Sequence, residues 1–271
     1  MKRNLNGSRI LLTGASSGIG RALAKRLTHE GARLIVTARR EAALHSLEEE
    51  LKSDRNGEIV IVVGDVTFPE TRASLIRTAE ERFGGLDALI NNAGVGATER
   101  VEETSEETAR RLLEINYFAP LFLTRAALPL LKKSASDPDV AKKEIHPIVV
   151  NLGSIVGLRG TPHYGVYGSA KAALITLTDA LRAELAGDGI DFLTVCPGTT
   201  RTEFFDVLLE NKSMPKFPPH RSVPAEVVAE KIVRAMKKGT HRIIPHAPSR
   251  ILDRLQRLSP GLVDSIMASF R

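Results

Sequence analysis

The sequence contains no tryptophan, only one cysteine and few aromatic residues, which make up 4% of the chain. One cysteine, Cys196, excludes an internal disulfide bond and a cysteine-rich metal site, and this usage is typical of a reducing compartment. Long apolar runs are also missing. The basic start offers only residues 10–12 before Thr13 and Gly14, too few for a signal-peptide core, and no window approaches the roughly 18 apolar residues of a membrane helix. We therefore expect a cytoplasmic protein without a transmembrane segment.

Concentrated charge is absent as well, although the formal net charge is +6. Lysines and arginines are spread among acidic residues, and no basic run alternates with aromatic residues that would stack on bases. This pattern argues against nucleic-acid binding and leaves a weak attraction to anionic small molecules such as phosphates. No His, Asp or Glu cluster has the spacing of a metal site, so we expect no metal.

Short β-branched runs alternate with longer amphipathic stretches, which is typical of βαβ units and a parallel sheet. Near-continuous apolar content in most of these runs indicates a sheet covered by helices on both faces. The sequence therefore predicts an α/β fold, a doubly wound sheet of about seven parallel strands in a single domain. The expected strands are residues 9–14, 32–38, 58–66, 86–94, 146–154, 190–198 and 240–246.

Three other segments have a predictable course. The first helix should end at Gly31, because glycine is the usual residue just past a helix C-terminus. A long helix should begin near Thr104, which has Glu107 at capping-box spacing, and run to residue 131. The polar, proline-containing stretch 132–147 should be an exposed and mobile excursion.

The first strand runs into "TGASSGIG" (13–20) and then a helix, which places the glycines where a phosphate-binding turn belongs. Gly14 lets the chain turn, Gly18 lets the backbone approach a pyrophosphate, and Gly20 lets the helix pack closely on the strand. The spacing is G-x-x-x-G-x-G, and an ordinary tight turn is the alternative interpretation.

The second strand ends in Ala38, Arg39 and Arg40, where a dinucleotide's adenosine ribose would arrive. An acidic residue there would accept hydrogen bonds from the ribose of NAD, whereas a guanidinium suits the additional phosphate of NADP. Arg39 therefore favours NADP(H), with Ser16 able to add a hydroxyl contact. The alternative is that both arginines only begin a solvated helix.

The stretch "YGVYGSAK" (164–171) holds two of the three tyrosines. On a helix, Tyr167 and Lys171 would share one face, and the lysine charge would lower the tyrosine pKa toward the range where proton transfer is efficient. Tyr164 has no such partner and is expected to form a wall of the substrate pocket. Ser154 ends the fifth strand, at the edge of a parallel sheet where ligands bind, although a turn residue is the simpler interpretation.

Taken together, "TGASSGIG", "GDV" (64–66), "NNAG" (91–94), Asn116, Ser154, "YGSAK" (167–171) and "PGTTRT" (197–202) resemble the short-chain dehydrogenase/reductase family over residues 7–245. The resemblance implies a Rossmann-like subunit whose catalytic residues are Asn116, Ser154, Tyr167 and Lys171. It also implies cofactor contacts from Gly14, Ser16, Ser17, Gly18, Ile19, Gly20, Arg39, Asp65, Val66, Asn92, Ala93, Gly94, Tyr167, Lys171, Pro197, Gly198, Thr200 and Thr202.

The implied activity is hydride transfer between NADP(H) and the carbonyl or secondary alcohol of a small, hydrophobic substrate. An NADPH-binding regulatory or sensor protein without turnover is the alternative. The resemblance also implies a homodimer or homotetramer built on the long helices.

Two segments near the end of the sequence remain open. Residues 203–220, with Phe204, Phe205, Leu208, Leu209, Met214 and Phe217, form either a mobile loop over the cofactor or a packed helix-loop element. Residues 1–248 are expected to form the catalytic domain, and residues 249–271 an amphipathic helical extension broken at Pro260 and Gly261. The extension would pack on its own or a neighbouring subunit, or contact a membrane peripherally. Arg159 and His163 would either meet an anionic substrate group or be solvated.

Overall fold

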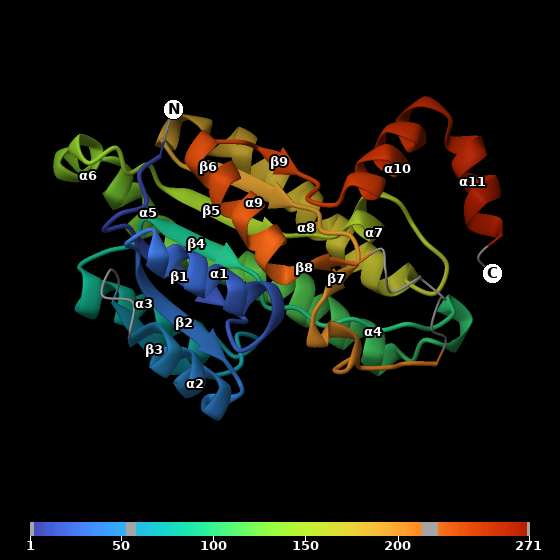
Figure 1. Ribbon diagram of the computed structural model, residues 1–271, viewed down its shortest axis with the longest axis horizontal. Helices are drawn as coiled ribbons and strands as arrows, with labels where there is room; N and C mark the ends of the chain where they lie inside the picture. Colours follow the sequence, from blue (N-terminus) through green and yellow to red (C-terminus); the bar gives the residue numbers. More distant parts are fainter. Residues whose placement is uncertain (1–2, 53–57, 213–221, 270–271) are drawn as a thin grey trace.

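The computed structural model describes residues 3–52, 58–212 and 222–269. Seven strands form one parallel sheet in the order β3-β2-β1-β4-β5-β6-β9 (Figure 1). Successive strands are added on one side of β1 up to β3 and on its other side from β4 onward. Their bounds are β1 Arg9–Thr13, β2 Arg33–Ala38, β3 Ile59–Val63, β4 Ala88–Asn91, β5 Ile148–Leu152, β6 Asp191–Val195 and β9 Arg242–Ile243. The predicted parallel sheet is confirmed, and each strand is shorter than its predicted range because the flanking residues turn into loops.

Helices cover both faces of the sheet, and the alternation of side chains explains why. Ile10 and Leu12 of β1 pack in one apolar cluster, whereas Leu11 between them packs in the other. The first cluster is closed by α1 (Gly18–His29), α2 (Glu41–Lys52) and α9 (Ala225–Lys238). The second is closed by α3 (Pro69–Phe83), α5 (Ala119–Ala135) and part of α8 (Gly165–Glu184).

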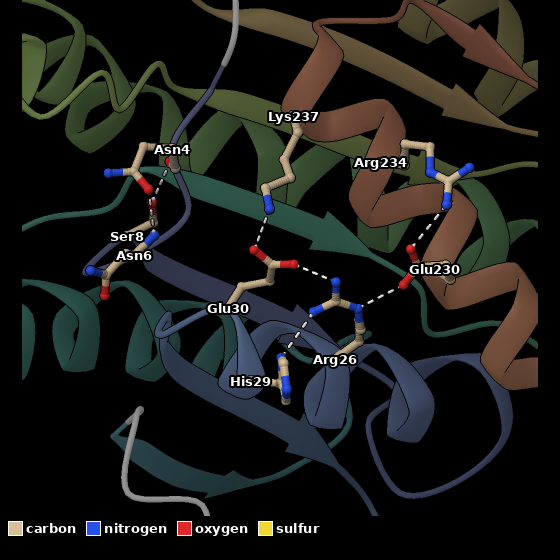
Figure 2. A network of polar contacts seen from close by, with 9 residues as sticks. All are labelled: Asn4, Asn6, Ser8, Arg26, His29, Glu30, Glu230, Arg234 and Lys237. Atoms are coloured by element: carbon tan, nitrogen blue, oxygen red, sulfur yellow. Dashed lines mark hydrogen bonds and ion pairs between the residues drawn. The ribbon is translucent and has the colours of Figure 1, made fainter.

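Ion pairs join α1 and α9 on the outer surface of the first layer (Figure 2). Arg26 of α1 contacts Glu30, which directly follows that helix, and Glu230 of α9, and Lys237 of α9 contacts Glu30. Apolar packing beneath does most of the stabilising, because partly exposed pairs contribute little each. The network connects α9 to the C-terminal end of α1, the helix whose N-terminal end begins in the glycine loop. Gly31, with a φ of 81°, follows the end of α1 as predicted.

The long helix differs from its prediction in two respects. Its N-cap is Ser105, whose hydroxyl accepts from the Thr108 N–H, and not Thr104. It is also divided into α4 (Glu106–Leu113), a π-helical turn η2 (Glu114–Phe118) and α5. The turn contains Asn116, and such widened turns often occur at functional sites.

The stretch 132–147 is more ordered than a simple excursion. The end of α5 extends to Ala135, a short helix α6 (Pro138–Lys142) follows, and Val140 and Ile145 are buried. These two apolar side chains anchor an otherwise mostly exposed segment. The remaining short elements are η1 (Val101–Glu103), α7 (Ile155–Leu158), η3 (Ala186–Asp188), η4 (Glu203–Phe205) and a two-stranded sheet of β7 (Thr200–Arg201) and β8 (Val223–Pro224).

Two helices follow the last strand, α10 (Ala247–Leu258) and α11 (Pro260–Ala268), as the amphipathic pattern predicts. They stand beyond the end of the sheet beside α7 (Figure 1). The break falls at Ser259, and Pro260 begins α11 because proline fits the first turn of a helix. Across the described ranges, no helix combines the length and apolar character needed to cross a bilayer. The division at residue 248 stays a prediction.

Candidate active site

A cavity of about 720 Å³ lies at the carboxyl ends of the central strands. This is the edge at which parallel α/β sheets bind ligands. Every predicted site residue except Asn116 lines it: Gly14, Ser16, Ser17, Gly18, Ile19, Gly20, Arg39, Asp65, Val66, Asn92, Ala93, Gly94, Ser154, Tyr167, Lys171, Pro197, Gly198, Thr200 and Thr202. These residues come from positions 14 to 202 of the sequence, and the fold brings them to one cavity.

The loop between β1 and α1 has the geometry of a phosphate cradle. Gly14 has a φ of 70°, which favours glycine, and a Cβ at Gly20 would lie only 2.1 Å from the Gly14 carbonyl oxygen. Helix α1 begins at Gly18, so its first N–H groups face the cavity without intrahelical partners. No acidic side chain occupies its first turn. These features fit a pyrophosphate, because unpaired N–H groups and the helix dipole both favour an anion.

Asn92, one of the predicted cofactor contacts, supports the loop itself. Its side-chain amide donates to the carbonyl oxygens of Thr13 at 2.9 Å and Gly14 at 3.0 Å. The Thr13 hydroxyl in turn accepts from the Asn92 and Ala93 N–H groups, each at 3.0 Å. The end of β4 therefore holds the glycine loop in shape.

The two arginines after β2 differ in their surroundings. Arg39 is more than half exposed, and its nearest acidic partner is the Asp65 carboxylate at 3.9 Å. Arg40 donates to the Ser16 hydroxyl at 3.2 Å and pairs with Glu203 at 2.7 Å. Both line the cavity. Sequence reasoning chose Arg39 alone, whereas the structure brings Arg40 into contact with Ser16.

Ser154, Tyr167 and Lys171 come together at the centre of the cavity. Ser154 ends the loop after β5 and caps α7, accepting from the Val156 N–H at 3.4 Å. Tyr167 and Lys171 lie one turn apart on α8, both buried, with the Lys171 Nζ 5.9 Å from the Tyr167 ring centroid. Lys171 donates to the Leu152 carbonyl oxygen at 2.8 Å. The predicted shared face is thus present.

The pKa directions at this site differ from the expectation. Burial raises the pKa of the Tyr167 phenol above its ordinary value, and the neighbouring Ser154 hydroxyl only partly opposes this. Burial also lowers the pKa of Lys171 to about 8, because the charged form is poorly solvated there. Desolvation therefore dominates the pKa of both groups in the protein alone, and the expected lowering of the Tyr167 pKa by the lysine charge is not seen. Tyr167 carries its proton at neutral pH, which is the state of an acid.

Asn116 lies one layer behind the cavity wall, in the π-helical turn. Its amide nitrogen donates to the carbonyl oxygens of Val95 and Leu112, both at 2.9 Å. Its side-chain oxygen is buried and has no hydrogen-bond partner among the described residues. A Cβ built at Gly94 would lie 2.8 Å from this oxygen and 3.2 Å from the Lys171 Nζ. Asn116 thus lies on the Lys171 side of the site, and its side-chain oxygen can accept a further hydrogen bond.

The segment after β6 closes the cavity from one side. Thr202 caps η4, and the Phe204 ring packs 5.7 Å from the Tyr167 ring, centroid to centroid. Leu209 donates its N–H to Gly96, and Asn211 pairs with Thr98. The described part is therefore a packed element and not a free loop. Met214 and Phe217 lie outside the described residues.

The segment from His246 onward, with α10 and α11, is called the tail here. It also lines the cavity, and sequence reasoning missed this. The additional lining residues are His246, Pro248, Ser249, Leu252, Ile266 and Met267. An amphipathic pattern indicates that one face is covered without indicating what covers it. Tyr164, expected as a pocket wall, does line the cavity, and burial raises its pKa to about 12.

Arg159 does not face an anionic ligand group but pairs with Asp264 of α11. No group of three or more potential metal ligands occurs within the described ranges.

Comparison with known proteins gives consistent matches. A family model described as short chain dehydrogenase matches residues 8–213. An uncharacterized oxidoreductase of Thermotoga maritima is 34% identical over 200 residues, covering 74% of each chain. A short chain dehydrogenase/reductase from Burkholderia phymatum in complex with NAD has a TM-score of 0.82 and 26% identity, covering 96% of both chains. A short-chain dehydrogenase from Sphingobium yanoikuyae in complex with NADPH has a TM-score of 0.76 and 27% identity, covering 95% of both.

Proposed function

The chain belongs to the short-chain dehydrogenase/reductase family of oxidoreductases, and we propose that it reduces the carbonyl group of a small hydrophobic molecule with NADPH, or runs the reverse oxidation. One observation carries the proposal: Ser154, Tyr167 and Lys171 line the same cavity as the glycine loop. A hydride donor held by that loop would then reach the carbonyl carbon of a substrate, and a proton donor would reach the oxygen of the same carbonyl.

The cofactor site is assigned to the loop, the ends of β2 and β3, and the segment after β6. The N-terminus of α1 and the backbone from Gly18 to Gly20 would hold the pyrophosphate, and Asp65 and Val66 the adenine. Arg39 and Ser16 would bind the additional phosphate that distinguishes NADP from NAD, and the cationic character of this corner supports that choice. When bound, the cofactor supplies the hydride.

Tyr167 would donate the proton. Its phenol carries the proton at neutral pH, and the oxygen that becomes negative as the carbonyl carbon is reduced is basic enough to take that proton. The hydroxyl of Ser154 would hydrogen-bond the same oxygen and orient it. Both groups come from rigid elements, α8 and the cap of α7, so they need little rearrangement.

Lys171 and Asn116 would restore the proton after each turnover. Lys171 has a pKa of about 8 and lies on the Tyr167 face of α8, so it can exchange a proton near neutral pH. The unpaired oxygen of Asn116 would accept a hydrogen bond from a water, because buried polar atoms are rarely left unsatisfied. This water would connect Lys171 to solvent.

The test is to follow the absorbance of reduced nicotinamide with NADPH, and then NADH, across ketones, quinones, steroids, sugars and 3-oxoacyl thioesters. Tyr167→Phe should lower kcat about 10²- to 10⁴-fold, the usual worth of a general acid, while NADPH still binds. Tyr164→Phe is the matched control and should keep most of its activity.

Retained activity in Tyr167→Phe would contradict the assignment of the acid. NADPH binding by the wild-type chain without turnover of any compound would instead favour the regulatory or sensor function. The predictions of a cytoplasmic location and of a homodimer or homotetramer stay predictions.

A further inference from the structure

The cavity that contains Ser154 and Tyr167 is also lined by three apolar side chains of the tail. Leu252 comes from α10, and Ile266 and Met267 come from α11. They lie more than 80 positions beyond Tyr167 in the sequence, yet share one hollow with it. The tail is therefore part of the pocket wall.

The tail contacts the catalytic region at two points. Helix α10 lies against α7, and Asp264 of α11 pairs with Arg159. Arg159 directly follows α7, whose N-cap is Ser154. Helix α7 has four residues, a rise of about 6 Å, so the apolar wall is tied one short helix away from the reacting oxygen.

The three tail side chains of this wall are apolar. Leu252, Ile266 and Met267 bring no charge or hydrogen-bonding group, and Val156 and Phe204 add further apolar surface to the same cavity. The volume of about 720 Å³ also includes the space beside the proposed cofactor residues, so a substrate would occupy only part of it. The apolar wall and the hydroxyls of Ser154 and Tyr167 thus line one hollow.

The outer face of the same helices provides a contrast. Ile251 is 67% exposed and Leu258 is 84% exposed, and neither lines the cavity. Leu252 and Leu258 are therefore two leucines of one helix, of which only Leu252 faces the pocket.

We propose that the tail determines substrate specificity by selecting carbonyl compounds, or the corresponding alcohols, that carry an extended apolar arm. The arm lies against Leu252, Ile266 and Met267 while the carbonyl oxygen meets Tyr167 and Ser154. This inference rests on the proposed function for its chemistry, since the arm must be attached to the reacting group. In this proposal the tail contacts the substrate and does not serve only in subunit packing.

The experiment measures kcat/KM with NADPH for unbranched methyl ketones from butanone to dodecanone. In the wild-type chain, kcat/KM should rise about fourfold for each methylene that reaches the wall, the usual gain for burying one such group. Leu252→Gln should flatten this rise and lower the value for decanone roughly tenfold, with butanone unchanged. Leu258→Gln should leave the whole series as in the wild type. Met267→Gln should behave like Leu252→Gln.

A second measurement does not depend on turnover. Calorimetric titration of decanone into the protein loaded with oxidised NADP, which cannot reduce the ketone, should show weaker binding for Leu252→Gln, by a similar factor, and unchanged binding for Leu258→Gln. Equal effects of the two substitutions, or a chain-length series that Leu252→Gln leaves intact, would overturn the inference. Absence of ketone reduction together with Leu252-dependent binding would uphold the inference and contradict the proposed reaction.

Discussion

The Nζ atom of Lys171 lies 5.9 Å from the centroid of the Tyr167 ring, and its hydrogen bond goes to the Leu152 carbonyl oxygen. The lysine is held beside the phenol without bonding to it. Both side chains are buried, and desolvation is the main cause of the pKa shift of each.

Replacing Lys171 by methionine should change how stability depends on pH. The folded pKa of about 8 lies below the ordinary value near 10.4, so between these values the unfolded chain binds the proton that the folded chain lacks. Wild-type stability should therefore rise with pH across this window, by at most about 3 kcal/mol relative to Lys171→Met. Urea unfolding of both proteins at about pH 7 and about pH 10 measures the difference.

The exposed Lys142→Met is the control for this comparison and should show no such trend. A stability difference between wild type and Lys171→Met that stays constant over the window would mean that the lysine is not desolvated as the structure indicates.

Arg39→Gln should weaken NADPH more than NADH. If Arg39 binds the additional phosphate, its loss removes a charge-assisted contact and should raise KM for NADPH about ten- to hundredfold, with KM for NADH nearly unchanged. Steady-state kinetics with both cofactors checks this.

Arg40→Gln is the informative neighbour, because Arg40 already contacts Ser16 and Glu203. A larger loss of NADPH preference in Arg40→Gln than in Arg39→Gln would indicate that Arg40 binds the additional phosphate. Unchanged preference in both variants would count against NADP(H) as the cofactor.

Gly20→Ala should damage the cofactor loop. The new Cβ would lie 2.1 Å from the Gly14 carbonyl oxygen, which is backbone, and 2.4 Å from the Asn92 amide nitrogen, which two hydrogen bonds hold in place. We expect the free energy of unfolding to fall by about 1–3 kcal/mol and NADPH affinity to fall with it. Denaturant unfolding and cofactor titration test both parts.

Gly187→Ala is the matched control, because nothing lies within 4 Å of a Cβ built there. Wild-type cofactor affinity in Gly20→Ala would show that the loop is not the phosphate cradle.

Much of the fold was predictable because the strands are nearly continuous apolar runs and the loops carry glycine, a signal that is local in sequence. The π-helical turn was not predictable, since Glu114 to Phe118 has the sequence pattern of ordinary helix, and the hydrogen bond of Asn116 to Val95 within this turn is a contact that no local pattern reports. The cap at Ser105 was missed because Thr104 has an equally plausible spacing, and only backbone angles distinguish them.

The site was predicted more completely than its electrostatics. Gly14, Asn92 and Ser154 meet because they follow strands of one parallel sheet, whose carboxyl ends share an edge, and this follows from topology. The raised pKa of Tyr167 and the lowered pKa of Lys171 depend on burial, which no sequence spacing reports. The same holds for Leu252 and Met267, whose amphipathic pattern left the covering surface open.

The four residues of helix α7 connect Ser154 of the proposed active site to Arg159, which pairs with the tail. Ser154 begins it and Arg159 follows it, so an insertion of one residue would rotate Arg159 by about 100° around the helix axis. Asp264 would lose its partner, and the tail would lose its tie to the catalytic region. Natural variants of this protein that differ in substrate range should therefore vary by substitution along α10 and α11, and keep the length of α7 unchanged.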